Sequence, residues 1–130
     1  MESLINLVSN PVNNNDYKIF CQSQLDTFGA LVLESFLTDK TLKYLQIEAQ
    51  KIRHKAYFCS QKHNVYLLDN DGSFPTEHVR NAEQISDKGC IPEDIIPDSS
   101  PLRKLYKSEE FQDFLEVVLG VKIFPYADNL

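Results

Sequence analysis

Residues 99–130 read SSPLRKLYKSEEFQDFLEVVLGVKIFPYADNL, and this stretch carries the clearest structural signals in the chain. Ser100 before Pro101 predicts a helix start, because a serine hydroxyl caps free N–H groups and proline lacks only an N–H that the first turn leaves unpaired. Ser108 begins a second helix, which ends at Gly120. Its apolar face carries Phe111, Phe114, Leu115 and Val118. We therefore predict two successive helices in this stretch.

Val121–Tyr126, which follows the second helix, alternates apolar and polar side chains as a half-buried strand does. A strand must pair with another strand in order to form. The sequence ends four residues after this one. We therefore expect its partner strand to come from a longer protein, or from a second copy that pairs with the open strand edge to give a homodimer.

Two further helices are predicted upstream. Asp16 caps a helix that ends at Gly29, and Thr38 caps a helix over Asp39–Arg53. The short apolar run Ala30–Leu33 between them predicts a buried strand. This strand would be the first in the chain.

The first fifteen residues are predicted to be a flexible N-terminus. The run SNPVNNN at 9–15 has loop composition and shows no periodicity that would hold it in a fold. Residues 16–130 then make up the folded region.

The middle of the chain changes from a helical period to a strand period. Tyr57–Cys59 and Asn64–Leu68 predict two strands of a hairpin, with a polar connection between them. The run DNDG at 69–72 predicts a tight turn. Residues 73–99 contain three prolines and a glycine, and we predict a long irregular loop there.

The composition excludes several classes of protein. With 130 residues, of which 42% are hydrophobic, the chain can form one domain or part of a larger one. A net charge of −6 argues against nucleic acid as a partner, because binding to phosphates needs a basic face. No apolar run approaches the ~18 residues that span a bilayer, and the start MESL lacks the basic region of a signal peptide. We predict a cytoplasmic protein without a membrane partner.

No metal site is predicted from the residues of this chain. Cys21, Cys59 and Cys90 are odd in number and widely spaced, which fits reduced thiols better than a disulfide framework. Cys59 and His63 have the spacing of half a zinc site, but no second pair accompanies them. The DNDG run lacks the alternating acids and the terminal glutamate of a calcium loop.

Several of these stretches together resemble one family of enzymes. The runs SPLRKLY at 100–106, FQDFLEVVLG at 111–120 and FPYADNL at 124–130 are similar to the segment just before the iron-binding core of certain iron(II)/2-oxoglutarate-dependent oxygenases. That family includes free-amino-acid hydroxylases and halogenases. The runs GALVLESFL at 29–37, HNVYL at 63–67 and EHVRN at 77–81 fit the same family, although it more often has proline where Val79 and Asn129 stand.

The resemblance implies an α+β fold built on a double-stranded β-helix, the jelly-roll or cupin-like fold of these oxygenases. Residues 16–130 would form the N-terminal portion of the oxygenase domain. The helices at Asp39–Arg53 and Glu109–Leu119 would pack outside the major sheet. Ala30–Leu33 and Val121–Tyr126 would be strands of that sheet.

The resemblance also implies cofactors, namely Fe(II) and 2-oxoglutarate. Such enzymes hold iron with two histidines and one carboxylate, and the first histidine and the carboxylate form a His-x-Asp/Glu motif. His54, His63 and His78 are followed by Lys-Ala, Asn-Val and Val-Arg, so none begins this motif. We therefore expect the iron ligands to lie outside these 130 residues, with neither cofactor bound to this chain alone.

The family's substrate is a small molecule, such as an amino acid, that carries a carboxylate. Arg80 is the leading candidate to bind it, because a guanidinium presents a fork of donors that matches a carboxylate. The alternative is a surface arginine that pairs with Glu77 or Glu83. His78 is a second candidate contact or else a structural histidine. Asn64 and Tyr66 would line the cavity from one face of their strand, or pack across strands.

Two functions follow from these observations. The first is the N-terminal portion of a dioxygenase whose intact form hydroxylates an amino acid or a similar small molecule, with halogenation as the less favoured alternative. The second is a non-catalytic binding module that kept the oxygenase scaffold without its metal site. Reading the coding sequence past Leu130 for His-x-Asp separates the two.

Overall fold

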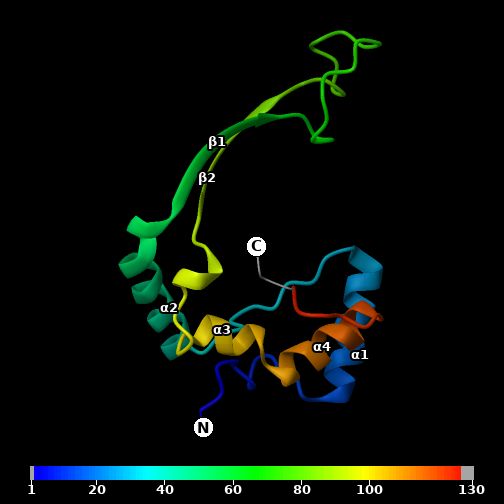
Figure 1. Ribbon diagram of the computed structural model, residues 1–130. Coiled ribbons are helices and arrows are strands. Elements are labelled where there is room, and N and C mark those ends of the chain that lie inside the picture. The colour runs from blue at the N-terminus through cyan, green and yellow to red at the C-terminus, as the bar shows by residue number, and fades with distance from the viewer. Residues whose placement is uncertain (1, 127–130) are drawn as a thin grey trace. The chain divides into compact units, whose positions relative to one another are not determined.

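The computed structural model describes residues 2–126, which divide into two compact units. Unit 1 contains residues 2–51 and 96–126, and unit 2 contains residues 52–95. The elements in chain order are α1 (Asn15–Phe28), α2 (Asp39–Ile52), β1 (Tyr57–His63), β2 (Gln84–Cys90), α3 (Pro101–Tyr106) and α4 (Glu109–Leu119), as labelled in Figure 1. Short 3-10 turns occupy Arg53–Lys55 and Glu93–Ile95.

The predicted helices α3 and α4 are confirmed, and so are their ends. The Ser100 hydroxyl accepts a hydrogen bond from the Leu102 N–H at 3.2 Å, and the Ser108 hydroxyl accepts one from the Phe111 N–H at 3.2 Å. Gly120 closes α4 at a φ of 68°, in the left-handed region that glycine adopts without strain.

The two upstream helices are also confirmed, with small shifts at their ends. Asn14 caps α1 in place of the predicted Asp16, and its side-chain oxygen accepts from the Tyr17 N–H at 3.0 Å. Thr38 caps α2 as predicted, since its hydroxyl accepts from the Thr41 N–H at 3.2 Å. Gly29 ends α1 at a φ of 70°.

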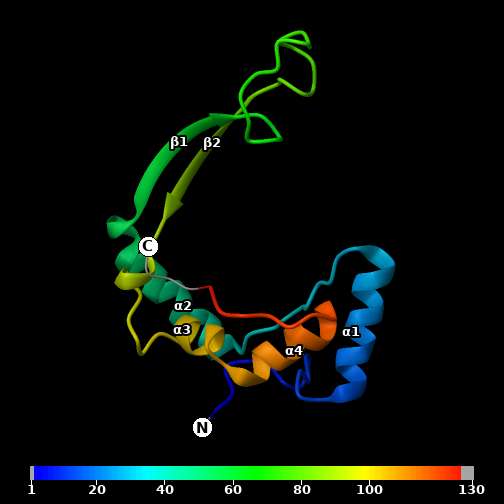
Figure 2. The same ribbon diagram turned by 45° about the vertical axis from the view of Figure 1, so that its right-hand side comes forward.

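Unit 1 has an apolar core between α1 and α4, which Figure 2 shows side by side. The rings of Tyr17 and Phe114 stack there, with centroids 6.3 Å apart. The buried apolar residues are Ile5, Val12, Cys21, Phe114 and Val118. Ile5 and Val12 come from the segment that we predicted to be flexible, so these first residues are part of the core.

Both strands predicted for unit 1 are wrong. Ala30–Leu33 has no regular structure, and the bridge nearest to it joins Leu37 with Ile5. Val121–Tyr126 is irregular as well, and side chains accept hydrogen bonds from two of its N–H groups. The Ile123 N–H donates to Glu116 Oε1 at 3.2 Å, and the Tyr126 N–H donates to the Tyr106 hydroxyl at 2.7 Å. The strand edge that suggested a homodimer is therefore not formed within residues 121–126.

Unit 2 is a hairpin that differs from the one we predicted. β1 runs through the polar residues 60–63 and pairs antiparallel with β2, from Tyr57 opposite Cys90 to His63 opposite Gln84. Residues 64–68 turn instead of forming a strand, and β2 lies inside the region predicted as an irregular loop. The prediction relied on the alternation of apolar and polar residues that a half-buried strand shows. Neither face of this hairpin is buried, so its strands do not require that alternation. Residues 2–126 combine helices with one two-stranded sheet, and the double-stranded β-helix stays a prediction.

Candidate functional site

The four predicted site residues all lie in one part of the structure, the connecting segment between β1 and β2 (residues 64–83). Asn64 comes directly after β1 and Tyr66 follows in the same turn, whereas His78 and Arg80 lie in the turns that return to β2. Within unit 2 the structure brings Arg80 into contact with Tyr66, fourteen positions earlier, and with the neighbouring His78, whereas Asn64 bonds only its own turn.

Arg80 and Tyr66 form the central contact of this segment. The guanidinium carbon of Arg80 lies 4.7 Å from the centroid of the Tyr66 ring, within the range of a cation–π interaction. The Arg80 Nη1 atom is buried and has no hydrogen-bond partner within residues 2–126. Glu83, one of the predicted alternative partners, instead pairs with Lys62 at 2.9 Å, and this contact raises the pKa of Lys62.

His78 holds the backbone of Arg80. Its Nδ1 atom accepts a hydrogen bond from the Arg80 N–H at 3.1 Å, which leaves Nε2 as the nitrogen that carries the proton in the neutral ring. The His78 ring stacks on Phe74 with centroids 4.6 Å apart. His78 therefore adjoins the candidate site through its contact with the backbone.

Asn64 is buried, and its side-chain amide serves the segment itself. Its Oδ1 atom accepts from the N–H groups of Tyr66 at 3.0 Å and Leu68 at 3.3 Å, and its Nδ2 atom donates to the Leu68 carbonyl at 2.7 Å. These bonds fix the turn that carries Tyr66. Asn64 therefore supports the backbone of the candidate site and does not line a cavity with its amide.

Asn81 is a buried residue of this segment that our sequence reasoning did not select. Its Oδ1 atom accepts from the Asp71 N–H at 2.8 Å. Its Nδ2 atom lies within hydrogen-bond distance of the carbonyls of Asp71 at 2.9 Å, Phe74 at 3.1 Å and Pro75 at 3.2 Å. The one available signal was its position directly after Arg80 in the EHVRN run.

Asp71 adds a negative charge to the same segment. Its carboxylate accepts from the Ser73 N–H at 2.9 Å. Hydrogen bonds from Ser73 lower the pKa of Asp71, and the charge of Arg80 adds to this effect. Asp71 is half-buried, and its carboxylate does not accept a hydrogen bond from the buried Nη1 atom of Arg80.

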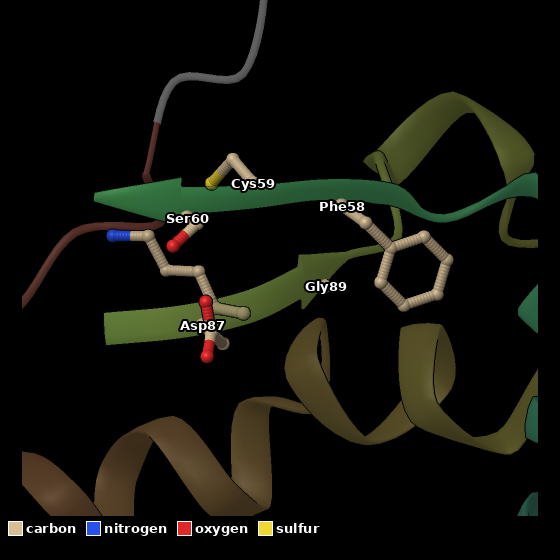
Figure 3. Close-up of a pocket in the computed structure, with 6 residues that line it drawn as sticks. Phe58, Cys59, Ser60, Asp87 and Gly89 are labelled. Atoms are coloured by element: carbon tan, nitrogen blue, oxygen red, sulfur yellow. The ribbon is translucent and has the colours of Figure 1, made fainter. Parts of the chain in front are cut away.

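A concave surface lies on the hairpin itself. It is lined by Phe58, Cys59, Ser60, Asp87, Lys88 and Gly89, and Figure 3 shows the Phe58 side chain beside Gly89 on the neighbouring strand. This hollow is open to solvent. It lacks an unpaired buried donor such as Arg80 Nη1.

Residues 2–126 contain neither a cluster of metal ligands nor a helix that could span a membrane. In that range no three His, Cys, Asp or Glu side chains gather closely enough to hold a metal ion, and Cys21, Cys59 and Cys90 are free thiols. None of the helices there combines the length and apolar character needed to cross a bilayer. Comparison of the chain with known protein families, curated proteins and solved structures gives no match.

Proposed function

We propose that this chain is part of a cytoplasmic iron(II)/2-oxoglutarate-dependent oxygenase with a double-stranded β-helix fold. The intact enzyme would hydroxylate an amino acid or a similar small molecule, with halogenation as the less favoured alternative. Within it, the connecting segment of unit 2 binds the substrate carboxylate through Arg80. The resemblance of six stretches of sequence supports the enzyme class, and the geometry around Arg80 supports the role of the segment.

The observation that carries the role of Arg80 is its buried and unpaired Nη1 atom. A buried charged donor without an acceptor costs about 1–3 kcal/mol or more, so an acceptor supplied by a ligand is strongly favoured there. Carboxylates match the guanidinium fork with two parallel hydrogen bonds. The ring of Tyr66 holds the plane of the fork, which reduces the conformational entropy lost on binding.

Tyr66 also suggests how the remainder of the substrate is accommodated. Its side chain is 59% exposed although the guanidinium covers part of it. An apolar part of an amino-acid substrate would contact the exposed part of the ring while the carboxylate binds Arg80. His78 contributes by holding the Arg80 backbone.

The cofactors are assigned outside the described residues. The two-histidine, one-carboxylate set that this enzyme class uses is not provided by residues 2–126. Iron bound by the intact enzyme would supply oxygen activation, and 2-oxoglutarate would supply the reducing electrons. The contribution that we assign to this chain is substrate binding and orientation.

The test is steady-state kinetics of the full-length gene product with Fe(II), 2-oxoglutarate and a panel of amino acids. Arg80→Ala should raise KM for the amino acid by about 10- to 100-fold with little change in kcat, since the lost bonds to a charged group are worth roughly 1.5–3 kcal/mol. Arg80→Lys should recover only part of this loss. Arg53→Ala, an exposed arginine of unit 2, is the matched control and should leave KM unchanged.

Three other outcomes are informative. An unchanged KM in Arg80→Ala removes Arg80 from the site. Turnover of no amino acid by the iron-loaded protein contradicts the enzyme class. Amino-acid binding that depends on Arg80 but leads to no turnover supports the non-catalytic binding module.

A further inference from the structure

The connecting segment is held by polar side chains where most folded segments are held by apolar ones. Asn64 and Asn81 are the buried side chains of unit 2, at 3% and 1% exposure. Apolar residues of the same segment are exposed, including Val65 at 74% and Val79 at 77%. The order of the segment therefore rests largely on hydrogen bonds made by two amide groups.

Asn81 fixes the half of the segment that carries Arg80. Its Oδ1 atom accepts from the Asp71 N–H, and its Nδ2 atom donates to the Asp71 carbonyl. Nδ2 also lies within hydrogen-bond distance of the carbonyls of Phe74 and Pro75. Its own N–H donates to the His78 carbonyl at 2.7 Å. Arg80, which directly precedes Asn81, is thus held in two ways. Its neighbour Asn81 is anchored, and its own N–H donates to His78 Nδ1.

Asn64 fixes the half that carries Tyr66. Its Oδ1 atom accepts from the N–H groups of Tyr66 and Leu68, which closes the turn directly after β1. Each member of the Arg80–Tyr66 pair therefore has a buried asparagine one or two residues before or after it. The stacking of the pair requires both turns to keep their positions.

We propose that Asn81 and Asn64 are positioning residues that hold Arg80 stacked on Tyr66, with Nη1 free to donate a hydrogen bond to a ligand anion. This inference rests on the proposed function for the identity of the anion, a carboxylate. The stacking geometry can be measured independently of any activity. Asn81 carries the larger share, because it anchors three backbone positions and Asn64 anchors two.

Asparagine-to-aspartate changes separate this role from simple space filling. Asn81→Asp keeps the size of the side chain and its acceptor for the Asp71 N–H, but it removes the donor and places a carboxylate oxygen against three carbonyls. Asn64→Asp keeps both acceptor bonds and loses only the donor bond to Leu68. Asn70→Asp adds the same charge at an exposed position of the segment and is the control.

The stacking is read from the NMR signals of the Arg80 Cδ protons, which the Tyr66 ring shifts upfield. Tyr66→Leu defines the unstacked value. Asn81→Asp should lose most of the upfield shift while the amide signals of β1 and β2 keep their positions. Asn64→Asp should lose a smaller part of it, and Asn70→Asp should match the wild type. Titration with sodium acetate, against sodium chloride, should show about tenfold weaker acetate binding in Asn81→Asp.

An unchanged Arg80 shift in Asn81→Asp, with the hairpin intact, would overturn the positioning role. If Asn81→Asp also disrupts the hairpin signals, Asn64→Asp decides, and an unchanged shift there overturns the proposal. If Arg80→Ala binds acetate as tightly as the wild type does, the proposed function is contradicted but the positioning role of the asparagines is not. In that case the stacking data would still test the asparagines.

Discussion

Units 1 and 2 of this protein are stabilised by different interactions. Unit 1 buries apolar side chains between α1 and α4, with Phe114 and Val12 at 0% exposure. Unit 2 buries the amides of Asn64 and Asn81 and leaves most of its large apolar side chains exposed. Apolar burial is non-directional and scales with area, whereas an amide network depends on the position of every donor and acceptor.

This difference suits the roles that we assign to the two units. A hydrophobic core tolerates small changes of shape at modest cost, which makes it a suitable scaffold. A network of buried hydrogen bonds fixes one arrangement of a segment, and a binding site requires such a fixed arrangement. Mutations in the two units should therefore differ in both the size and the location of their effects.

The largest effect is expected from Phe114→Ala in unit 1. The ring is fully buried and stacks on Tyr17, so its removal leaves a cavity and should lower the free energy of unfolding by about 3–5 kcal/mol. Urea unfolding followed by circular dichroism measures the loss. Native-state hydrogen exchange should show the decrease in the amides of α1 and α4, while those of the connecting segment exchange through local opening and change little.

Phe124→Ala is the matched control for this experiment. Phe124 is 78% exposed, so its truncation should change stability by no more than about 0.5 kcal/mol. Equal losses in the two variants would contradict the position of the core. Equal losses of protection in both units of Phe114→Ala would show that the two units open together.

The second effect is a loss of stability of unit 1 at alkaline pH. Burial raises the pKa of Tyr17 to about 12, and the neighbouring Cys21 adds to the shift. Because the unfolded phenol has a pKa near 10, the contribution of Tyr17 is complete below pH 10 and is lost as the pH rises toward 12. The loss should reach about 2–3 kcal/mol, measured by urea unfolding at each pH.

Tyr17→Phe tests the assignment of this loss. The variant should show a shallower decline above pH 10, although burial also raises the pKa of the Cys21 thiol and leaves a decline in the same direction. Tyr44→Phe changes an exposed tyrosine of α2 and should keep the full decline. Identical pH profiles for all three proteins would exclude Tyr17 as the source.

The parts of the fold that sequence reasoning predicted are the helices of unit 1, because their signals are local. A capping hydroxyl such as Ser108 acts on an N–H three residues away, and Gly120 ends its helix by its own conformation. The amphipathic face of α4 placed Phe114 and Val118 correctly in the core. Each of these signals lies within one or two turns of the residue that it positions.

The strands were predicted poorly, because their signals depend on a partner and on a buried face. Ala30–Leu33 and Val121–Tyr126 have strand-like composition, but in the described part of the chain no strand lies beside either of them. β2 forms in a polar stretch because β1 pairs with it, not because one of its faces is buried.

The grouping of the candidate site residues could be predicted only in part, for a related reason. Arg80, His78, Asn64 and Tyr66 do lie in one segment, and the contact of Arg80 with Tyr66 joins residues fourteen positions apart. Asn81 was missed because its partners depend on how the chain returns on itself. The carbonyls that it binds belong to residues six to ten positions earlier.

The smallest effect is expected from a glycine change in the hairpin, compared with the same change in unit 1. Gly29→Ala places a Cβ on a backbone at φ of 70°, which should cost about 1–2 kcal/mol although nothing lies within 4 Å of the new atom. Gly89→Ala places a Cβ 2.6 Å from Cε1 of Phe58. That ring is 63% exposed and can rotate away, so the loss should stay within about 0.5 kcal/mol.

Urea unfolding of both variants, with hydrogen exchange of the β1 and β2 amides, measures the two losses. The loss of stability in Gly89→Ala should be smaller than that in Gly29→Ala, because the Phe58 ring can move into solvent whereas the backbone at Gly29 cannot relax its positive φ. A loss above about 1 kcal/mol in Gly89→Ala would show that the Phe58 ring is held in place. Unit 2 would then depend on an apolar contact as well as on its asparagines, and the contrast with unit 1 would be smaller than we describe.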